Sequence, residues 1–279
     1  MKKVMILGVH GMAGNMIYSY LSSLNKYSIV TIARTDFPFP VDYTMEVIEG
    51  SYDLEAIISK EKPDIIINCI GVLVKYSSQY PIKAYIINSL FPKYLATITH
   101  NTKTKIIHLS TDCVFSGTRG NYLDTDMPDG IGPYASTKSK GEIRNDKDLT
   151  IRMSIIGPEL KDNPTGLFGW FMAQSGKVKG FSNCMWSGIT TLCLAQNIDE
   201  IIGCNLTGLY QLTPNYKISK YKLLKLIQKV WKRKDITILA DKSMVHNKTL
   251  LSSHRSNFKP IMPENYEEML KEMKEWEEK

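Results

Sequence analysis

The sequence has few of the residues that build disulfide frameworks and metal centres. Its 279 residues include five cysteines and five histidines, with no C-x-x-C pair and no histidines at the spacing of metal ligands. An odd number of cysteines without paired spacing argues against a disulfide scaffold or a zinc finger. Free cysteines in apolar surroundings behave as small hydrophobic residues. We therefore expect a protein of the reducing cytoplasm that has no metal site.

Long apolar runs and arginine-rich tracts are also lacking. No window approaches the roughly 20 apolar residues of a membrane span. The apolar run after Lys2 and Lys3 is short and interrupted by glycines, which indicates a buried first strand rather than a signal peptide. The net charge is +7, but the lysines are dispersed and no zinc-finger or RNP pattern occurs. We expect neither a membrane nor a nucleic-acid partner, and the positive charge suits small ligands that carry phosphate.

The first half of the chain does contain short, almost wholly apolar runs rich in β-branched residues. They lie at residues 3–7, 28–33, 64–68, 105–109 and 149–153. Runs that are apolar on both faces are typical of parallel strands covered by helices on both sides. Helical patterns separate them at residues 12–24, 54–60, 85–100 and 134–143, the third with Pro92 expected to kink or restart it. This alternation predicts an α/β fold with a doubly wound parallel sheet, the Rossmann fold.

Beyond residue 155 the alternation loosens. Helical stretches occur at 167–174, 191–202, 219–229 and 264–279, with short strand candidates at 208–212 and 236–239. We expect a sheet domain over residues 1–155. A smaller, mostly helical region over residues 156–279 is expected to pack on it, with an interleaved boundary.

A glycine-rich turn joins the first expected strand to the first helix. Gly8, Gly11 and Gly14 are spaced G-x-x-G-x-x-G. A tight turn needs residues without Cβ, and bare backbone at a helix N-terminus lets a pyrophosphate approach closely. A lone glycine triplet is weak, but the strand before it and the helix after it favour a dinucleotide site. Glycines that serve helix–strand packing alone are the alternative.

The residues after the second expected strand help to predict which dinucleotide is bound. Arg34 follows the strand, and Thr35 can add a hydroxyl contact. An arginine at this place suits the 2′-phosphate of NADP, whereas NAD sites usually have an acidic residue there. We predict NADPH as the cofactor, and NADH stays an alternative because Asp36 is close by.

Three groups with suitable chemistry are expected at one end of the sheet. Tyr134 and Lys138 form a Y-x-x-x-K pair on one helix face, and the preceding strand ends in Ser110 and Thr111. Hydride reduction of a ketone leaves an alkoxide, which a tyrosine can protonate. An adjacent ammonium lowers the phenol pKa, and a hydroxyl stabilises the developing charge. We therefore predict that Lys138 lowers the pKa of Tyr134 and that Thr111 bonds the carbonyl oxygen.

The sequence resembles an extended short-chain dehydrogenase/reductase of the dTDP-4-dehydrorhamnose reductase (RmlD-like) group. The segments that carry the resemblance are GVHGMAG, NCIGVL, INSLFPKYLA, STDCVFSG, YASTKSKGE and IRMSIIG. This family reduces the 4-keto group of a nucleotide-linked 6-deoxysugar with NAD(P)H. The resemblance implies that Thr111, Tyr134 and Lys138 are the catalytic residues, with residues 1–155 binding the cofactor and 156–279 the substrate.

The resemblance also implies the residues along the cofactor and the substrate. The cofactor positions are Gly8, His10, Gly11, Met12, Gly14, Arg34, Thr35, Cys69, Ile70, Gly71, Asn88, Ser110 and Ser154. The substrate positions are Val72, Asp112, Cys113 and Trp186. Cys113 and Ile155 depart from the family, which often has aromatic residues there, so the substrate wall is expected to differ. Trp186 is a candidate replacement that stacks on a base or sugar face, and ordinary core packing is the alternative.

The sequence therefore predicts an NADPH-dependent reductase of a nucleoside-diphosphate 4-keto-6-deoxysugar, in the biosynthesis of a deoxysugar for surface polysaccharide. Related dehydratases have a glutamate where this chain has Cys113, which counts against dehydration. A bifunctional epimerase/reductase would pair that cysteine with a downstream histidine, yet none occurs between His108 and His246. A non-catalytic NADP-binding regulatory subunit is a further alternative, because a fold does not fix a function. The nucleotide and the sugar stay open, and a homodimer is the candidate assembly.

Overall fold

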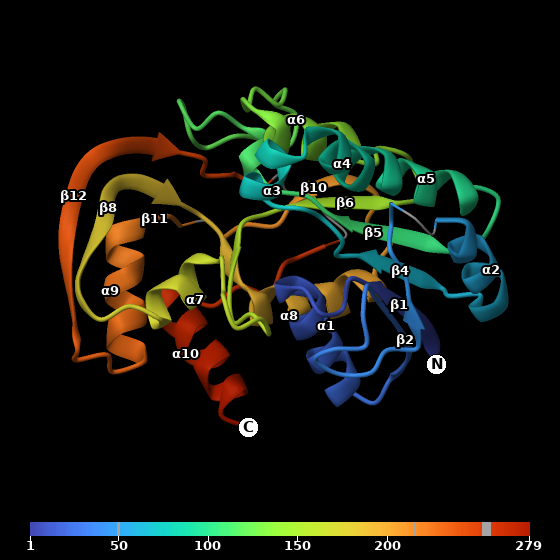
Figure 1. Ribbon diagram of the computed structural model, residues 1–279, viewed down its shortest axis with the longest axis horizontal. Coiled ribbons are helices and arrows are strands. Elements are labelled where there is room, and N and C mark those ends of the chain that lie inside the picture. Colours follow the sequence, from blue (N-terminus) through green and yellow to red (C-terminus); the bar gives the residue numbers. More distant parts are fainter. Residues whose placement is uncertain (49–50, 215, 253–257) are drawn as a thin grey trace.

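The computed structural model describes residues 1–48, 51–214, 216–252 and 258–279. Within them, a seven-stranded parallel sheet has the order β10-β6-β5-β4-β1-β2-β3 (Figure 1). The strands are β1 (Lys2–Leu7), β2 (Tyr27–Ala33), β3 (Tyr43–Thr44), β4 (Ile65–Asn68), β5 (Lys105–Leu109), β6 (Leu149–Arg152) and β10 (Gly208–Gln211). The strand order runs outward in both directions from β1, so the predicted doubly wound α/β fold is confirmed.

Helices cover both faces of this sheet, as Figure 1 shows. One face carries α1 (Met12–Ser23) and α8 (Thr191–Gly203). The other carries α2 (Ser51–Glu61), α3 (Val74–Gln79), α4 (Pro81–Tyr85), α5 (Phe91–Ile98) and α6 (Pro133–Gly141). Alternate residues of β1 point to opposite faces, since side chains alternate along a strand. Val4 and Ile6 join the core under α1 and α8, whereas Met5 and Leu7 join the core under α2 and α5.

The helix expected over residues 85–100 is interrupted. Between α4 and α5 the chain forms a π-helical turn, η1 (Ile86–Leu90). Pro92 lies in the first turn of α5, directly after this π-helical turn, where a proline cannot donate a backbone hydrogen bond to the preceding turn. Among the described helices, none is both long and apolar enough to cross a membrane.

The second region contains more sheet than the sequence indicated. β8 (Gly176–Trp186), β11 (Ile218–Ser219) and β12 (Ile236–Asn247) form a three-stranded sheet, and β7 (Ile155–Ile156) pairs with β9 (Ile189–Thr190). The helices α7 (Leu167–Met172), α9 (Lys220–Val230) and α10 (Tyr266–Glu277) lie in the same region (Figure 1). Helices still cover more of this region than strands do, and the three-stranded sheet adds to them. The start of β12 matches the strand candidate at 236–239, whereas β8 alternates exposed lysines with buried residues and so forms no apolar run.

Candidate active site

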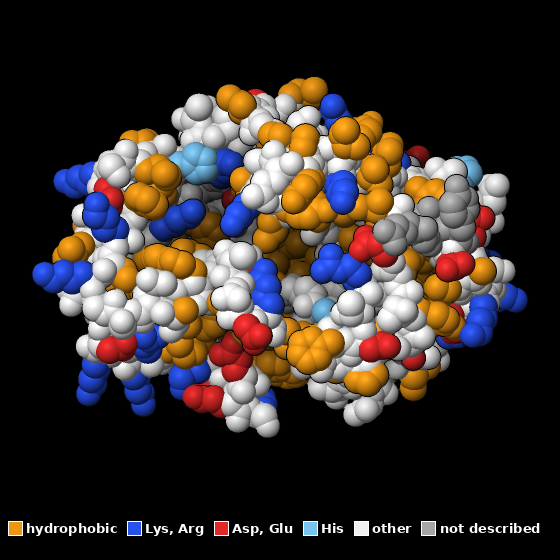
Figure 2. Space-filling model, viewed as in Figure 1, with side chains coloured by type: hydrophobic (Ala, Val, Ile, Leu, Met, Phe, Trp, Pro, Cys, Tyr) orange, Lys and Arg blue, Asp and Glu red, His pale blue; other side chains and the backbone are white. Residues whose placement is uncertain are grey.

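Two adjoining cavities lie over the carboxyl ends of the central strands. One has a volume of about 960 Å³ and extends to Arg34, and the other, of about 470 Å³, extends to Gly11. Val72, Cys113 and Tyr134 line both. Figure 2 shows the hollow on this face, with hydrophobic side chains in its floor and lysine and arginine side chains at its margin. In an open α/β sheet this edge is where ligands bind.

The glycine turn forms one end of the smaller cavity. Gly8 has a φ of +81°, a conformation that favours glycine. A Cβ on Gly14 would lie 2.3 Å from the carbonyl oxygen of Gly8, so Gly14 is needed for close packing of the turn. Gly11 and Met12 line the cavity at the N-terminal end of α1. Gly14 therefore serves packing, while Gly11 lines the cavity with backbone that carries no side chain.

The loop after β4 forms the adjoining wall. Cys69, Ile70 and Gly71 line the smaller cavity. Asn88 is fully buried: its Oδ1 accepts from the Val72 amide at 2.9 Å and its Nδ2 donates to the Val72 carbonyl at 3.1 Å. Asn88 lines neither cavity and fixes the loop that does, so its cofactor contact stays a prediction.

Arg34 lies at the far end of the larger cavity. Its side chain is 78% exposed, and its Nε is 3.9 Å from Oε2 of Glu46, which lines the same cavity. A guanidinium at this place can meet a phosphate, while the carboxylate of Glu46 opposes a second negative charge. Sequence reasoning missed Glu46 because it lies well beyond the end of β2 in the chain.

His10 and Thr35 do not reach the cavities. The Thr35 hydroxyl donates to the Phe37 carbonyl at 3.2 Å, and Nε2 of His10 lies 3.0 Å from the Phe39 carbonyl oxygen. Neither side chain lines the two cavities. Local backbone groups engage both side chains in the segment after β2, and their cofactor contacts stay predictions.

Tyr134 lies in the first turn of α6 and faces both cavities. Burial raises the pKa of its phenol, and the charge of an ionised Cys113 would raise it further. A hydrogen bond with Thr111 acts in the opposite direction but does not outweigh burial. The phenol therefore stays protonated at neutral pH and is available as a proton donor.

Lys138 is 5% exposed, and its Nζ donates to the Leu109 carbonyl at 2.7 Å. Burial lowers the pKa of this ammonium to about 8, and Glu142 and Cys69 oppose the change. Lys138 is not among the groups that shift the pKa of Tyr134. In this structure the ammonium is bonded to the end of β5 and desolvation dominates both groups, so the lowering of the phenol pKa by Lys138 stays a prediction.

Thr111 and Cys113 lie in a short turn after β5, where Asp112–Val114 forms the 3-10 turn η2. The Thr111 hydroxyl accepts from the Cys113 amide at 3.1 Å and donates to Oδ1 of Asp112 at 3.2 Å. All three residues line the smaller cavity. Burial and then the charge of Asp112 raise the pKa of the Cys113 thiol to about 12, so this thiol stays protonated at neutral pH and supplies almost no thiolate to act as a base.

Comparison with known proteins now adds the family. The model of the RmlD substrate binding domain matches residues 1–278. The chain belongs to this family. Its fold is similar to that of dTDP-4-dehydrorhamnose reductase from Bacillus anthracis str. Ames, solved in complex with NADP, with a TM-score of 0.82, 19% identity and 99% of each chain covered. The resemblance seen in the sequence is thus confirmed.

Curated relatives of this RmlD-family chain differ in how much of it they match. The dTDP-4-keto-6-deoxy-D-glucose reductase of Streptomyces niveus is 27% identical over 140 residues, 50% of this chain and 45% of that relative. The chain spans about half the length of the reductases it matches in this way. Methionine adenosyltransferase 2 subunit beta of Xenopus laevis is 21% identical over 80% of this chain and 70% of its own length.

Trp186 of this RmlD-family chain does not form a substrate wall. Its side chain is 5% exposed, its ring lies 5.3 Å from that of Tyr266, and its Nε1 donates to Oγ of Ser154 at 2.8 Å. Ser154 lines the smaller cavity, whereas Trp186 lines neither. The stacking interpretation is corrected in favour of core packing, and Trp186 reaches the site through the hydroxyl that it orients.

A loop of the second region forms part of the cavity walls. Its residues were not identified as candidates from the sequence. Lys161 lines both of them, and Glu159 lines the smaller one. The Glu159 carboxylate accepts from the amides of Thr165 and Gly166 at 2.8 and 2.6 Å. This loop has no strand or helix pattern, and only the fold shows that it lies opposite the glycine turn.

Proposed function

We propose that the protein is an NADPH-dependent reductase of the 4-keto group of a nucleoside-diphosphate 4-keto-6-deoxysugar, acting in the biosynthesis of a deoxysugar for surface polysaccharide. The observation that carries the proposal is the meeting of Thr111, Tyr134 and Lys138 in the cavity that begins at the glycine turn. Membership in the RmlD family and the reductase relatives support it.

The residues present fit a dinucleotide phosphate. Gly11 and Met12 offer backbone at a helix N-terminus for the pyrophosphate, and Arg34 is available to a 2′-phosphate. Lys138 is close to Gly71: a Cβ built on that glycine would lie 3.7 Å from the Lys138 Nζ. The ammonium can therefore donate to ribose hydroxyls at this wall. Bound NADPH supplies the hydride that the ketone carbon receives.

The chain itself supplies the proton and the oxyanion contact. Tyr134 donates the phenol proton to the sugar oxygen, and burial keeps the phenol protonated until the more basic alkoxide forms. The Thr111 hydroxyl exchanges its bond with Asp112 for one to the carbonyl oxygen as negative charge builds there. Lys138 holds the cofactor ribose and the end of β5 together.

Cys113 supports reduction over the alternative chemistries. It is a wall residue of both cavities, and its thiol pKa of about 12 makes it a poor acid/base group for epimerisation at neutral pH. Dehydration needs a carboxylic acid at this position, which the chain lacks. Val72 and Asp112 complete the proposed substrate wall with Cys113.

A second candidate function has an observation in its favour. The methionine adenosyltransferase subunit relative matches 80% of this chain, a larger share than the reductases match. A regulatory subunit would bind NADPH and a partner protein without turning over a sugar. The fold is compatible with both functions.

The test follows NADPH absorbance with a panel of dTDP-, UDP- and GDP-linked 4-keto-6-deoxysugars, and identifies each product by NMR. We expect oxidation of NADPH with at least one member and an alcohol at C4 of the product. Tight NADPH binding without oxidation by any member would contradict the reductase and support the regulatory subunit.

A further inference from the structure

The carboxylate of Glu142 is buried directly behind the proposed catalytic residues. Glu142 follows the last residue of α6 and is 3% exposed. Its Oε1 accepts from Nε of Arg152 at 2.6 Å and from Oγ of Ser110 at 3.0 Å. Its Oε2 accepts from Nη2 of Arg152 at 2.8 Å and from Nη2 of Arg144 at 2.9 Å. Burial works to raise the Glu142 pKa, but the hydrogen bonds and charge of Arg152 outweigh it, so the pKa is lowered and the group is ionised.

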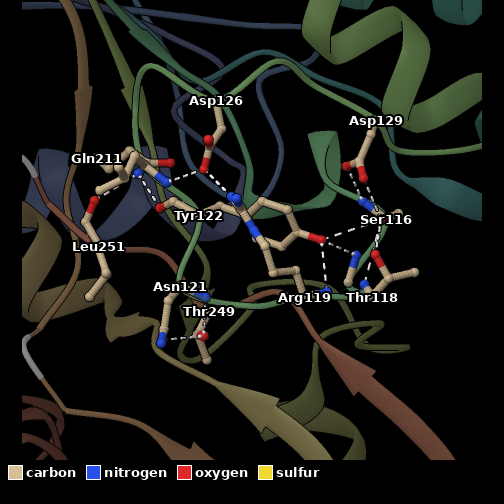
Figure 3. A network of polar contacts seen from close by, with 12 residues as sticks. Ser116, Thr118, Arg119, Asn121, Tyr122, Asp126, Asp129, Gln211, Thr249 and Leu251 are labelled. Atoms are coloured by element: carbon tan, nitrogen blue, oxygen red, sulfur yellow. Dashed lines mark hydrogen bonds and ion pairs between the residues drawn. The ribbon is translucent and has the colours of Figure 1, made fainter.

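Aromatic rings close the other side of this ion pair. The guanidinium of Arg152 lies 5.0 Å from the ring centre of Phe115, which stacks on Tyr122 at 4.2 Å. Figure 3 shows Tyr122 held at both ends, with its hydroxyl near Ser116 and its backbone bonded to Gln211 and Thr249. A fully buried cation between a carboxylate and a ring has little freedom to move. The Glu142 carboxylate is therefore fixed in place.

Glu142 and Lys138 bind neighbouring positions of the same strand end. Lys138 donates to the Leu109 carbonyl at 2.7 Å, and Glu142 accepts from the side chain of the next residue, Ser110. The two side chains are four positions apart at the end of one helix, a spacing that places them on the same side. Thr111 follows directly, so this pair holds the two residues that immediately precede the proposed oxyanion donor.

Cys69 and His108, which lie near Lys138 on or just after neighbouring strands, carry no charge at neutral pH. Burial raises the pKa of Cys69, which follows β4, to about 12. Burial lowers the pKa of His108 on β5 well below its usual value, and the charges of Lys138 and Lys93 lower it further. Nδ1 of His108 lies 3.1 Å from Nδ2 of Asn68, which fits a neutral ring. Within the described residues, Glu142 is thus the ionised group that opposes the burial of Lys138.

We propose that Glu142 is a positioning residue of the proposed active site, whose fixed, buried carboxylate keeps Lys138 positively charged and in place at the end of β5. This inference rests on the proposed function for its meaning in catalysis, but the charge on Lys138 is measurable without any substrate. Arg152 serves the same role indirectly, because it keeps Glu142 ionised and oriented.

The experiment titrates the Lys138 side chain of the ligand-free protein by NMR, with Lys138→Met used to assign its signal. In the unsubstituted protein we expect a midpoint near pH 8. In Glu142→Gln, which keeps the shape and removes the charge, we expect the midpoint to fall by about 1 unit or more. The basic limb of the pH profile of kcat/KM for the active substrate should move to lower pH by the same amount.

Glu55→Gln is the charge-matched control. It removes a carboxylate from the exposed face of α2, where Glu55 accepts from Tyr94, and should leave the Lys138 midpoint unchanged. If Glu142→Gln does not fold, the double variant Glu142→Gln/Arg152→Met removes both buried charges together and is the substitute, because replacing a whole ion pair costs less than breaking it.

An unchanged Lys138 midpoint in Glu142→Gln would overturn the inference, and so would a loss of thermal stability without a shift. The double variant also loses the cation of Arg152, which partly offsets the loss of the carboxylate, so a smaller fall of the midpoint is expected there, and a midpoint that stays or rises would overturn the inference. A shifted midpoint in a protein that reduces no sugar ketone would uphold the role of Glu142 while refuting the reductase. The two proposals therefore fail separately.

Discussion

The seven-stranded sheet and the three-stranded sheet of this protein contribute to the site in different ways. β4 and β6 are buried at every residue, and helices cover both of their faces. β8 and β12 have many exposed positions. The first sheet delivers Cys69, Ser110 and Thr111 from strand ends that packing holds rigid, whereas the second region contributes a loop that closes the cavities. Groups that need accurate placement for chemistry thus lie on the more deeply buried scaffold.

Removing the proton donor from the first sheet's site should produce the largest effect. We expect Tyr134→Phe to lower kcat about 10²- to 10⁴-fold, because the alkoxide then lacks its acid. NADPH affinity, measured by fluorescence titration, should change little. Tyr85→Phe is the control, since that ring is 42% exposed outside the cavities and its loss of a hydroxyl should leave kcat unchanged. Near-normal turnover of Tyr134→Phe would refute the assignment.

The next largest effect is expected when the close packing of the glycine turn is disrupted. In Gly14→Ala the new Cβ would meet the Gly8 carbonyl oxygen at 2.3 Å, so the turn must shift. We expect the free energy of unfolding to fall by about 1–3 kcal/mol and NADPH binding to weaken. Gly203→Ala, at the end of α8, has open space around the added Cβ and should keep or slightly raise stability in the same thermal melts. Equal melting temperatures for both variants would contradict this account.

A smaller effect on cofactor binding is expected from substitution of Arg34, at the exposed end of the larger cavity. Arg34→Ala should weaken NADPH binding about tenfold, as for the loss of one hydrogen bond to a charged group, while NADH binding changes less. Glu46→Gln is the matched variant, because it removes the carboxylate that faces Arg34 and should favour NADPH modestly. Equal losses for NADPH and NADH in isothermal titration would rule out a contact between Arg34 and the 2′-phosphate.

The smallest effect tests whether Trp186 belongs to the core of the second region rather than to the substrate wall. Trp186→Phe removes the hydrogen bond to Ser154 and should lower the free energy of unfolding by about 1 kcal/mol in denaturant titrations. The KM for the sugar should change less than the factor of ten that about 1.4 kcal/mol of lost binding produces. A larger rise in KM would restore the stacking interpretation of Trp186.

The two regions also differ in how readily the sequence reveals them. The strands of the first sheet are short apolar runs, because a strand that is buried on both faces needs apolar residues at nearly every position. β8 is buried at alternate positions only, and lysines and glycines interrupt it, so its 11 residues give no clear run. Glu142 shows the same limit at the site. Its position after the Tyr134 helix is readable, but its bonds to Ser110 and Arg152 join strands that only folding brings together.

The sequence by itself determined the parallel strand–helix alternation, the glycine turn, and the placement of Tyr134 and Lys138 on one helix face, because each depends on residues close together in the chain. Tertiary structure alone decided which candidates reach the cavity. It excluded Trp186, which Ser154 and Tyr266 hold in the core, and it set the protonation of Tyr134 and Lys138 through burial. Desolvation depends on every group packed around a side chain, and most of those groups come from distant parts of the chain.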